Sequence, residues 1–97
     1  MKMNIHLCDI SSGNNLFESR MQQLQDRSEY SDDYLINHVI LVPDFISFNV
    51  VTFKLQDGNH AFAEYMRRYP ALKIVEIADD CFDCSVTLLE KYEEKCL

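Results

Sequence analysis

Alternation of apolar and polar side chains marks the start of the chain. Residues 3–10, MNIHLCDI, place an apolar side chain at every second position up to residue 7, beginning with Met3, Ile5 and Leu7. A period of two residues is typical of a strand with one apolar face. The pattern therefore predicts a first strand over residues 3–10, followed by a turn in the polar stretch SSGNN.

A helical period follows this turn. Asn15 and Glu18 have the spacing of a capping box, in which the first side chain accepts hydrogen bonds from the amides of the first helical turn. Beyond them, the apolar residues recur at positions i, i+4 and i+7, namely Phe17, Met21 and Leu24. We expect a helix from Asn15 to about Ser28.

The most apolar stretch is residues 34–42, YLINHVILV, in which both odd and even positions are apolar. This composition predicts a strand that is buried on both faces. Pro43 and Asp44 come next, and they suit the middle of a tight turn. We therefore expect a hairpin, with its second strand over residues 45–56.

The second half of the chain repeats the same kinds of pattern. Residues 57–70 predict a helix with Asp57 or Asn59 as its cap and Pro70 as its stop. Residues 72–78 predict a strand, and residues 81–96 predict a last helix. Asp80 has the spacing of its cap, and its apolar stripe consists of Phe82, Val86, Leu89 and Cys96.

The resulting order, βαββαβα, predicts an α+β fold of the ferredoxin-like kind with one added C-terminal helix. In such a fold a four-stranded, mainly antiparallel sheet carries two helices on one face. Because residues 34–42 are apolar on both sides, the second face of this sheet needs a cover. That cover is either another protein surface or the added helix. The chain of 97 residues suits a single domain over residues 1–97.

Composition narrows the classes of partner. Sixteen acidic and nine basic residues give a net charge of −7, which opposes direct binding to nucleic acid and to anionic membranes. The first ten residues contain no apolar run of signal-peptide length. We therefore expect a cytoplasmic protein in which the four cysteines are thiols or metal ligands rather than disulfides.

Cys81 and Cys84 form a C-x-x-C pair with three possible roles: zinc ligation, thiol redox chemistry and simple packing. Zinc requires four ligands, whereas only one such pair is present. Redox chemistry requires a stabilised thiolate, but acidic residues flank the pair, including Asp79, Asp80 and Asp83. We favour packing, with cysteine as a small apolar side chain. The thiol or zinc protein remains the alternative function, and no cofactor is expected.

Enzymatic chemistry has one candidate. His60 lies four residues before Glu64, so a helix places imidazole and carboxylate on one face, as a general base with its orienting acid requires. No nucleophile or oxyanion-binding arrangement accompanies the pair. We favour a surface pair, and a protein that is not an enzyme.

The acidic residues are grouped rather than interspersed with lysine, so they can present a negative surface to a basic protein. We expect a non-enzymatic protein-binding module that forms homo-oligomers or binds a partner with a basic surface, which itself could be a nucleic-acid-binding protein. By analogy of size and charge, inhibitors such as immunity proteins, antitoxins and phage anti-defence or anti-CRISPR proteins fit. The expected partner-binding residues are Asp32, Asp33, Glu76, Asp79, Asp80, Asp83 and Phe48.

Overall fold

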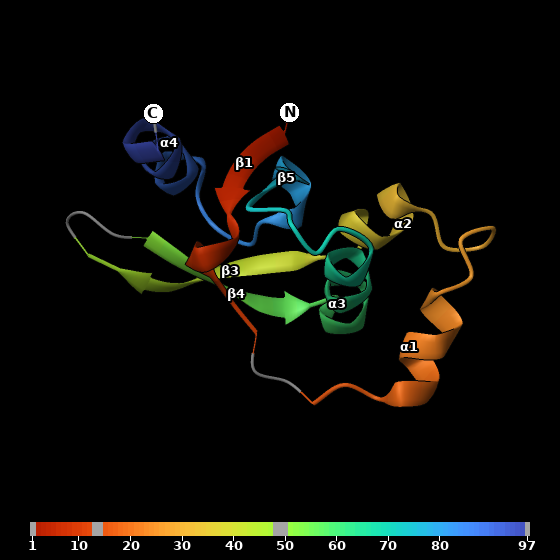
Figure 1. Cartoon of the computed structure of the whole chain (residues 1–97). Helices are drawn as coiled ribbons and strands as arrows, with labels where there is room; N and C mark the ends of the chain where they lie inside the picture. The colour runs from red at the N-terminus through yellow and green to blue at the C-terminus, as the bar shows by residue number, and fades with distance from the viewer. Residues whose placement is uncertain (1, 13–14, 48–50, 97) are drawn as a thin grey trace.

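The structure is a computed structural model that describes residues 2–12, 15–47 and 51–96. Of Cys96 it describes the backbone but not the side chain. Within these ranges the chain forms five strands, four α-helices and two 3-10 helices (Figure 1). In chain order these are β1 (Lys2–His6), η1 (Leu7–Asp9), β2 (Ile10–Ser11), α1 (Glu18–Leu24), α2 (Asp32–Asn37), β3 (Ile40–Ile46), β4 (Val51–Asp57), α3 (Asn59–Arg68), β5 (Ile74–Ala78), η2 (Asp79–Cys81) and α4 (Val86–Cys96).

The strands form two sheets. In one, β1 pairs with β5 in antiparallel orientation; in the other, β4 lies between β2, its parallel neighbour, and β3, its antiparallel neighbour. The predicted α+β class is confirmed. The predicted single four-stranded sheet with ferredoxin-like order is not matched in detail, because the 3-10 turn η1 divides the first strand into β1 and β2.

Tertiary hydrogen bonds hold this break in the first strand. The amide of Leu7 donates to the carbonyl of Lys73 at 2.9 Å, and the amide of His6 donates to the Tyr92 hydroxyl at 3.1 Å. That hydroxyl in turn donates to Asp9 Oδ2 at 2.6 Å. The backbone amides at the break therefore donate to the carbonyl of Lys73, just before β5, and to Tyr92 of α4, rather than to a continuous strand ladder.

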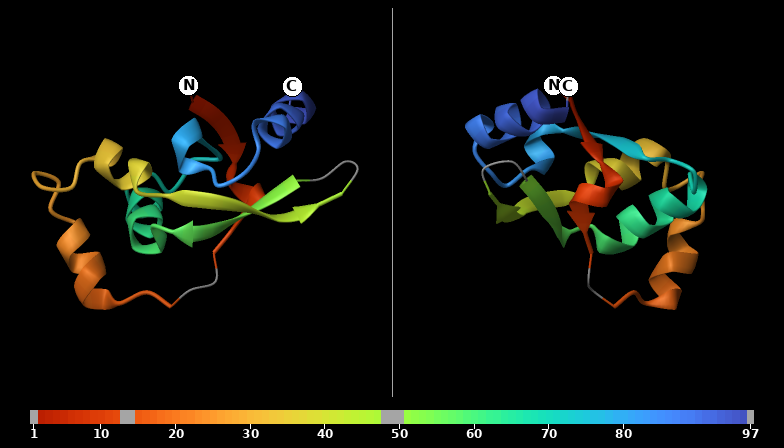
Figure 2. Two further views of the ribbon diagram at one scale, coloured as in Figure 1. Left: turned by 180° about the vertical axis from the view of Figure 1, so that it is seen from behind. Right: turned by 60° about the vertical axis from the view of Figure 1, so that its left-hand side comes forward.

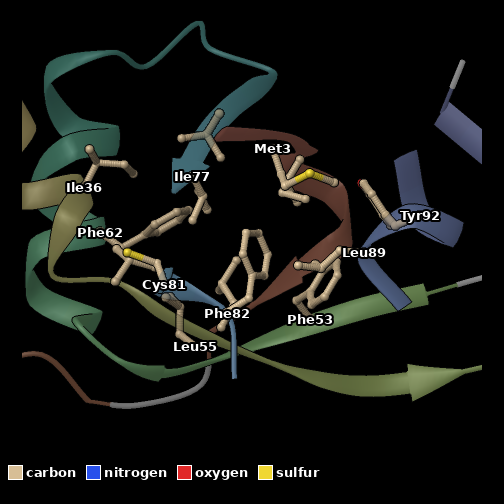
Figure 3. Close-up of a cluster of buried hydrophobic side chains, with 14 of the residues drawn as sticks. Met3, Ile36, Phe53, Leu55, Phe62, Ile77, Cys81, Phe82, Leu89 and Tyr92 are labelled. Atoms are coloured by element: carbon tan, nitrogen blue, oxygen red, sulfur yellow. The ribbon is translucent and has the colours of Figure 1, made fainter. Parts of the chain in front are cut away.

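The main core lies between the two sheets (Figure 3). The ring of Phe53 from β4 packs edge-on against Phe82 and Tyr92, with centroids 5.5 and 5.4 Å apart. Alternate residues of β1, β4 and β5 point into this space and are buried: Met3, Ile5, Val51, Phe53, Leu55, Val75 and Ile77. The intervening residues Asn4, Lys54, Gln56 and Glu76 are exposed. Each of these three strands thus buries one face, and on the other face of β5 Ile74 is exposed. The expectation of a second cover concerned residues 34–42, of which residues 34–37 belong to a helix and not to a sheet.

Residues 34–37 are helical, whereas the sequence pattern predicted a strand over residues 34–42. The Ser31 side chain caps α2 by accepting a hydrogen bond from the amide of Tyr34 at 3.1 Å. Leu35, Ile36 and Val39 are buried. Because Ile36 and Val39 follow Leu35 by one and four positions, the three residues also fit one side of a helical turn. The cap, which favours a helix, decides between the two periods.

Pro43 and Asp44 lie inside β3 rather than in a turn, which corrects the predicted hairpin position. The register of β3 against β4 shifts between Pro43 and Phe45, so Asp44 is the extra residue of a bulge. Because β3 is an edge strand of its sheet, a proline without an N–H is tolerated there. Phe48, one of the predicted partner-binding residues, lies outside the described residues.

Two helices begin later than predicted. Helix α1 begins at Glu18, and its N-cap residue Phe17 provides no side-chain cap, so the expected capping role of Asn15 is wrong. The Phe17 amide instead donates to His60 Nε2 at 2.9 Å, and the two rings stack. This contact holds the residue in an extended conformation and leaves α1 only seven residues long.

The last helix, α4, begins at Val86 rather than at residue 81, because residues 79–81 form the 3-10 turn η2. Asp80 is therefore not its cap; Ser85 Oγ accepts from the amide of Leu88 at 3.3 Å instead. Val86 is exposed, whereas Leu89 and Tyr92 are buried. Of the predicted stripe, Leu89 is buried within α4, and Phe82 is buried but precedes the helix. The side chain of Cys96 lies outside the described part of the chain.

Helix α3 follows the prediction closely, except at its cap. It spans Asn59–Arg68, and its N-cap is Gly58 with φ +79°. Asp57 Oδ1 accepts a hydrogen bond from the Gly58 amide at 2.8 Å. At the other end, Arg68 donates to the Leu24 carbonyl at 2.7 Å. This bond ties α1 to α3 at one end of the molecule (Figure 1).

Candidate functional site

Three of the predicted partner-binding carboxylates lie around one tyrosine. Tyr65 on α3 has a pKa above its ordinary value, first because of burial and then because of the negative charges of Asp32, Asp33 and Glu76. Asp32 and Asp33 begin α2, which lies next to β5, and Glu76 is on the exposed side of that strand. The fold thus brings together residues that are more than forty positions apart.

Asp32 is not available to a partner in the way the sequence suggests. Its Oδ1 accepts from Arg68 Nη1 at 2.9 Å, and its Oδ2 accepts from the Tyr69 hydroxyl. These hydrogen bonds, first from Tyr69 and then from Arg68, hold the pKa of Asp32 below its usual value. Asp33 and Glu76 are exposed, so these two carry the acidic surface at this end.

The other predicted carboxylates follow β5. Asp79 and Asp80 are in η2, and Asp83 is two residues beyond it; all three side chains are exposed. The Asp83 amide donates to the Leu41 carbonyl at 2.8 Å, which fixes this segment against β3. The acidic surface therefore consists of Asp33 and Glu76 near α2, and of Asp79, Asp80 and Asp83 after β5.

Two large apolar side chains are exposed on the hairpin formed by β3 and β4. Phe45 is 55% exposed and Ile46 is 59% exposed, and the hairpin protrudes from the rest of the molecule (Figure 2). The sequence does not predict this exposure, because with one extra residue at Val50 and Val51 its alternation puts Ile46 on the same face as Phe53. The bulge at Asp44 changes that alternation, and only the proline before it gave a local sign of an irregular strand.

The C-x-x-C pair is built for packing rather than for thiolate chemistry. Cys81 is buried, and its thiol points toward the Asn37 carbonyl at 3.6 Å. Burial raises the pKa of the Cys81 thiol, and the carboxylates of Asp80 and Asp79 raise it further. Burial and the charge of Asp83 likewise raise the pKa of Cys84. Among the residues whose positions are described, no three metal-binding side chains gather at one point.

The candidate catalytic pair is not formed. Glu64 is completely buried and accepts hydrogen bonds from Arg67 Nε at 2.7 Å and Arg68 Nε at 2.8 Å. His60 Nε2 accepts from the Phe17 amide instead. The carboxylate and the imidazole therefore serve two separate structural contacts, and the predicted surface pair of His60 with Glu64 is wrong as well.

Comparison with known proteins adds no relative to this geometry. A scan against models of protein families, a search of curated proteins and a search of solved structures each gave no match. Across the described ranges, none of the helices has the length and apolar character that crossing a membrane demands.

Proposed function

We propose that this chain is a non-enzymatic protein-binding module. The observation that carries the proposal is the exposure of two consecutive large apolar residues, Phe45 and Ile46, at the end of β3. Burial of large exposed apolar side chains in an interface makes the free energy of association more favourable. Aromatic and aliphatic anchors of this kind dominate the binding energy of protein interfaces.

The charge of the chain supports a basic partner. The net charge is −7, and exposed carboxylates line β5 and the segment that follows it. Complementary charge mainly accelerates encounter and sets specificity, whereas the apolar contact supplies affinity. We therefore propose a cytoplasmic inhibitor of the immunity, antitoxin or phage anti-defence and anti-CRISPR kind, in which charge guides encounter and the apolar contact supplies affinity. A nucleic-acid-binding protein is a suitable basic target.

Self-association uses the same hairpin. Strand β3 is at the edge of its sheet, although Phe82 bridges its first half at Leu41. An edge strand can pair with a strand of another chain. The hydrophobic pair at its end would be buried in that contact. The homodimer is therefore the first state to test, before any other partner.

The test uses a double variant that combines Phe45→Ser and Ile46→Ser. Its sedimentation velocity is compared with that of the native chain over a range of protein concentrations. Val86→Ser is the control, because Val86 is also an exposed apolar residue, 66% exposed, but belongs to α4 and not to the hairpin. We expect native-like association in the control and its loss in the double variant.

A binding partner from the native cell is tested with the same two variants. We expect capture to be abolished by the double variant, to survive Val86→Ser, and to weaken steeply with salt, as interactions between exposed charges do. A chain that stays monomeric at all concentrations and captures the same proteins with and without Phe45 and Ile46 contradicts the proposal.

A further inference from the structure

One hydrogen bond fastens the N-terminal end of α1 to α3. The amide of Phe17 donates to His60 Nε2 at 2.9 Å, and the two rings stack with centroids 5.8 Å apart. Phe17 is the N-cap residue of α1, and its carbonyl accepts a hydrogen bond from the amide of Met21 at 3.1 Å. The contact with His60 therefore holds the residue at which α1 begins.

This hydrogen bond requires one protonation state of His60. A backbone N–H can only donate, so Nε2 presents its lone pair and the ring proton of the neutral imidazole is on Nδ1. In the imidazolium form both ring nitrogens carry hydrogen, and neither of them can accept. Protonation of His60 therefore places two donors against each other and breaks the contact.

His38 is the second histidine at this end of the molecule, and it responds differently. Its Nδ1 lies 2.6 Å from the Tyr34 carbonyl oxygen, which can only accept, so Nδ1 carries a hydrogen. The imidazolium form keeps that hydrogen, so protonation leaves this contact intact. Of the two histidines, only His60 holds a contact that acid breaks.

The surroundings of His60 contain charges of both signs. His60 lines a cavity between α1, α2 and α3, and the other ionisable groups that line it are Arg20 of α1, Tyr34 of α2, His38 just after α2 and Asp57 at the end of β4. The Asp57 carboxylate favours an imidazolium nearby, whereas the Arg20 guanidinium opposes it. Glu64, one turn further along α3, is buried and engaged by two arginines. His60 itself is only half-buried, so a proton from solvent can reach it.

The other end of α1 is attached independently. Arg68 donates to the Leu24 carbonyl at 2.7 Å, and the Leu24 side chain is buried. Loss of the His60 contact therefore frees only residues 15–17 and the first turn of α1. Leu16 and Phe17 are exposed, so little apolar burial resists their release. Asn15 lines the cavity, and its movement opens that cavity on one side.

We propose that His60 is a pH-sensitive latch for the N-terminal end of α1. The neutral imidazole holds residues 15–17 against α3, and the imidazolium releases them. Histidine is the side chain whose charge ordinarily changes between about pH 5 and pH 8, so the latch is tested across that range. It goes beyond the protein-binding function proposed above, because neither Phe17 nor His60 belongs to the hairpin of β3 and β4.

Nuclear magnetic resonance of the full chain between about pH 8 and about pH 5 tests the latch. At the upper limit, we expect imidazole nitrogen shifts of the Nδ1–H tautomer of His60 and a scalar coupling from Nε2 to the Phe17 amide across the hydrogen bond. As the imidazolium forms, this coupling should disappear, and protection of the Phe17 amide against exchange should fall about fivefold, as for one lost hydrogen bond. Asp32 and Glu64 stay ionised in this range, because their pKa values lie below the ordinary 3.8 and 4.5.

Two variants assign the change to His60. His60→Gln keeps an acceptor but cannot be protonated, so protection of the Phe17 amide should become independent of pH. His38→Gln is the matched control, because it removes the other histidine of the cavity and should leave the change at Phe17 intact. The native measurement decides even where a variant does not fold. An Nε2–H tautomer of native His60, constant protection of the Phe17 amide, a pH response that survives His60→Gln, or its loss in His38→Gln overturns the proposal.

Discussion

Arg68 Nε donates a hydrogen bond to Glu64 Oε2 at 2.8 Å, and neither side chain is more than 1% exposed. The same guanidinium donates to Asp32 Oδ1 at 2.9 Å and to the Leu24 carbonyl at 2.7 Å. One buried cation thus satisfies groups from α1, α2 and α3. These three helices line a cavity of about 350 Å³, so this ion network holds its walls together.

Removal of the buried carboxylate should be far more costly than removal of its exposed partner. We expect Glu64→Ala to lower the free energy of unfolding by roughly 3–5 kcal/mol, because the buried Arg68 loses its only buried counter-charge and keeps only the partly exposed Asp32. Arg67 also binds Glu64, but its side chain is 50% exposed, so Arg67→Ala should cost less than about 1 kcal/mol. Urea unfolding followed by circular dichroism measures both. Equal losses would show that burial of the pair is unimportant.

Acid should destabilise the folded chain. Burial alone would raise the pKa of Glu64, but hydrogen bonds from Arg67 and Arg68 outweigh it and hold the pKa below its ordinary 4.5. The pKa of Asp32 is likewise below its ordinary 3.8. Carboxylates with a lowered folded-state pKa contribute stability above the unfolded-state values, and this stability is lost as pH falls through the folded-state values.

The measurement for this acid effect is the urea midpoint as a function of pH. We expect a plateau above about pH 5 and a progressive decrease below about pH 4. Glu64→Gln, which cannot ionise at this position, should show a shallower decrease than the native chain. A native midpoint that is constant down to pH 3 would refute the prediction.

Gly58 is required at the start of α3. Its φ of +79° is unfavourable for other residues, and an added Cβ would lie 2.4 Å from the His38 carbonyl oxygen. We expect Gly58→Ala to cost at least about 1–3 kcal/mol from the backbone alone. Ala63→Gly, in the middle of the same helix, should cost only about 1 kcal/mol. Thermal unfolding of the two variants compares these losses, and a smaller loss at Gly58 would disprove the strain argument.

The Tyr92 hydroxyl joins α4 to the break in the first strand. It accepts from the His6 amide and donates to Asp9, as described above. Tyr92→Phe should therefore cost roughly 1–3 kcal/mol, because it leaves partly buried partners unsatisfied. Tyr34→Phe removes the hydroxyl of an exposed tyrosine and should be nearly neutral. Chemical denaturation of both variants tests the difference, and similar values would argue against a structural role for this hydroxyl.

The thiols should differ in reactivity. The raised pKa and burial of Cys81 predict that little thiolate is present at pH 8, so iodoacetamide should modify it slowly in the folded chain. Cys8 is exposed and should react much faster. Peptide mass spectrometry gives both rates, and urea should bring them together. Modification of folded Cys81 at the rate of Cys8 would revive a redox function.

Strictly periodic segments allowed correct predictions from sequence. Met3 and Ile5 in β1 alternate with polar residues and are buried as expected. The strand predicted over residues 72–78 is also present, as β5. The run around Leu35 fits both a strand and a helical turn, so its period alone cannot decide between them. There a single serine cap, together with tertiary packing, produces the helix α2.

The candidate site was harder to predict because it depends on contacts between distant residues. Nothing near Asp32 in sequence indicates that Arg68, 36 positions later, will engage it. Similarly, the exposure of Phe45 follows from a protruding hairpin and from a bulge, for which Pro43 is only a weak local sign. The exposed carboxylates were easier, because charged side chains are rarely buried without a partner.

The 3-10 turn at Leu7–Asp9 has a consequence for how the chain opens. Because this turn connects β1 directly to β2, one stretch of ten residues provides a neighbour for β5 in one sheet and for β4 in the other. Detachment of this N-terminal stretch would strip both ladders in the same event and expose the core between them. The two layers are therefore coupled into one cooperative unfolding unit by a segment at the very beginning of the chain.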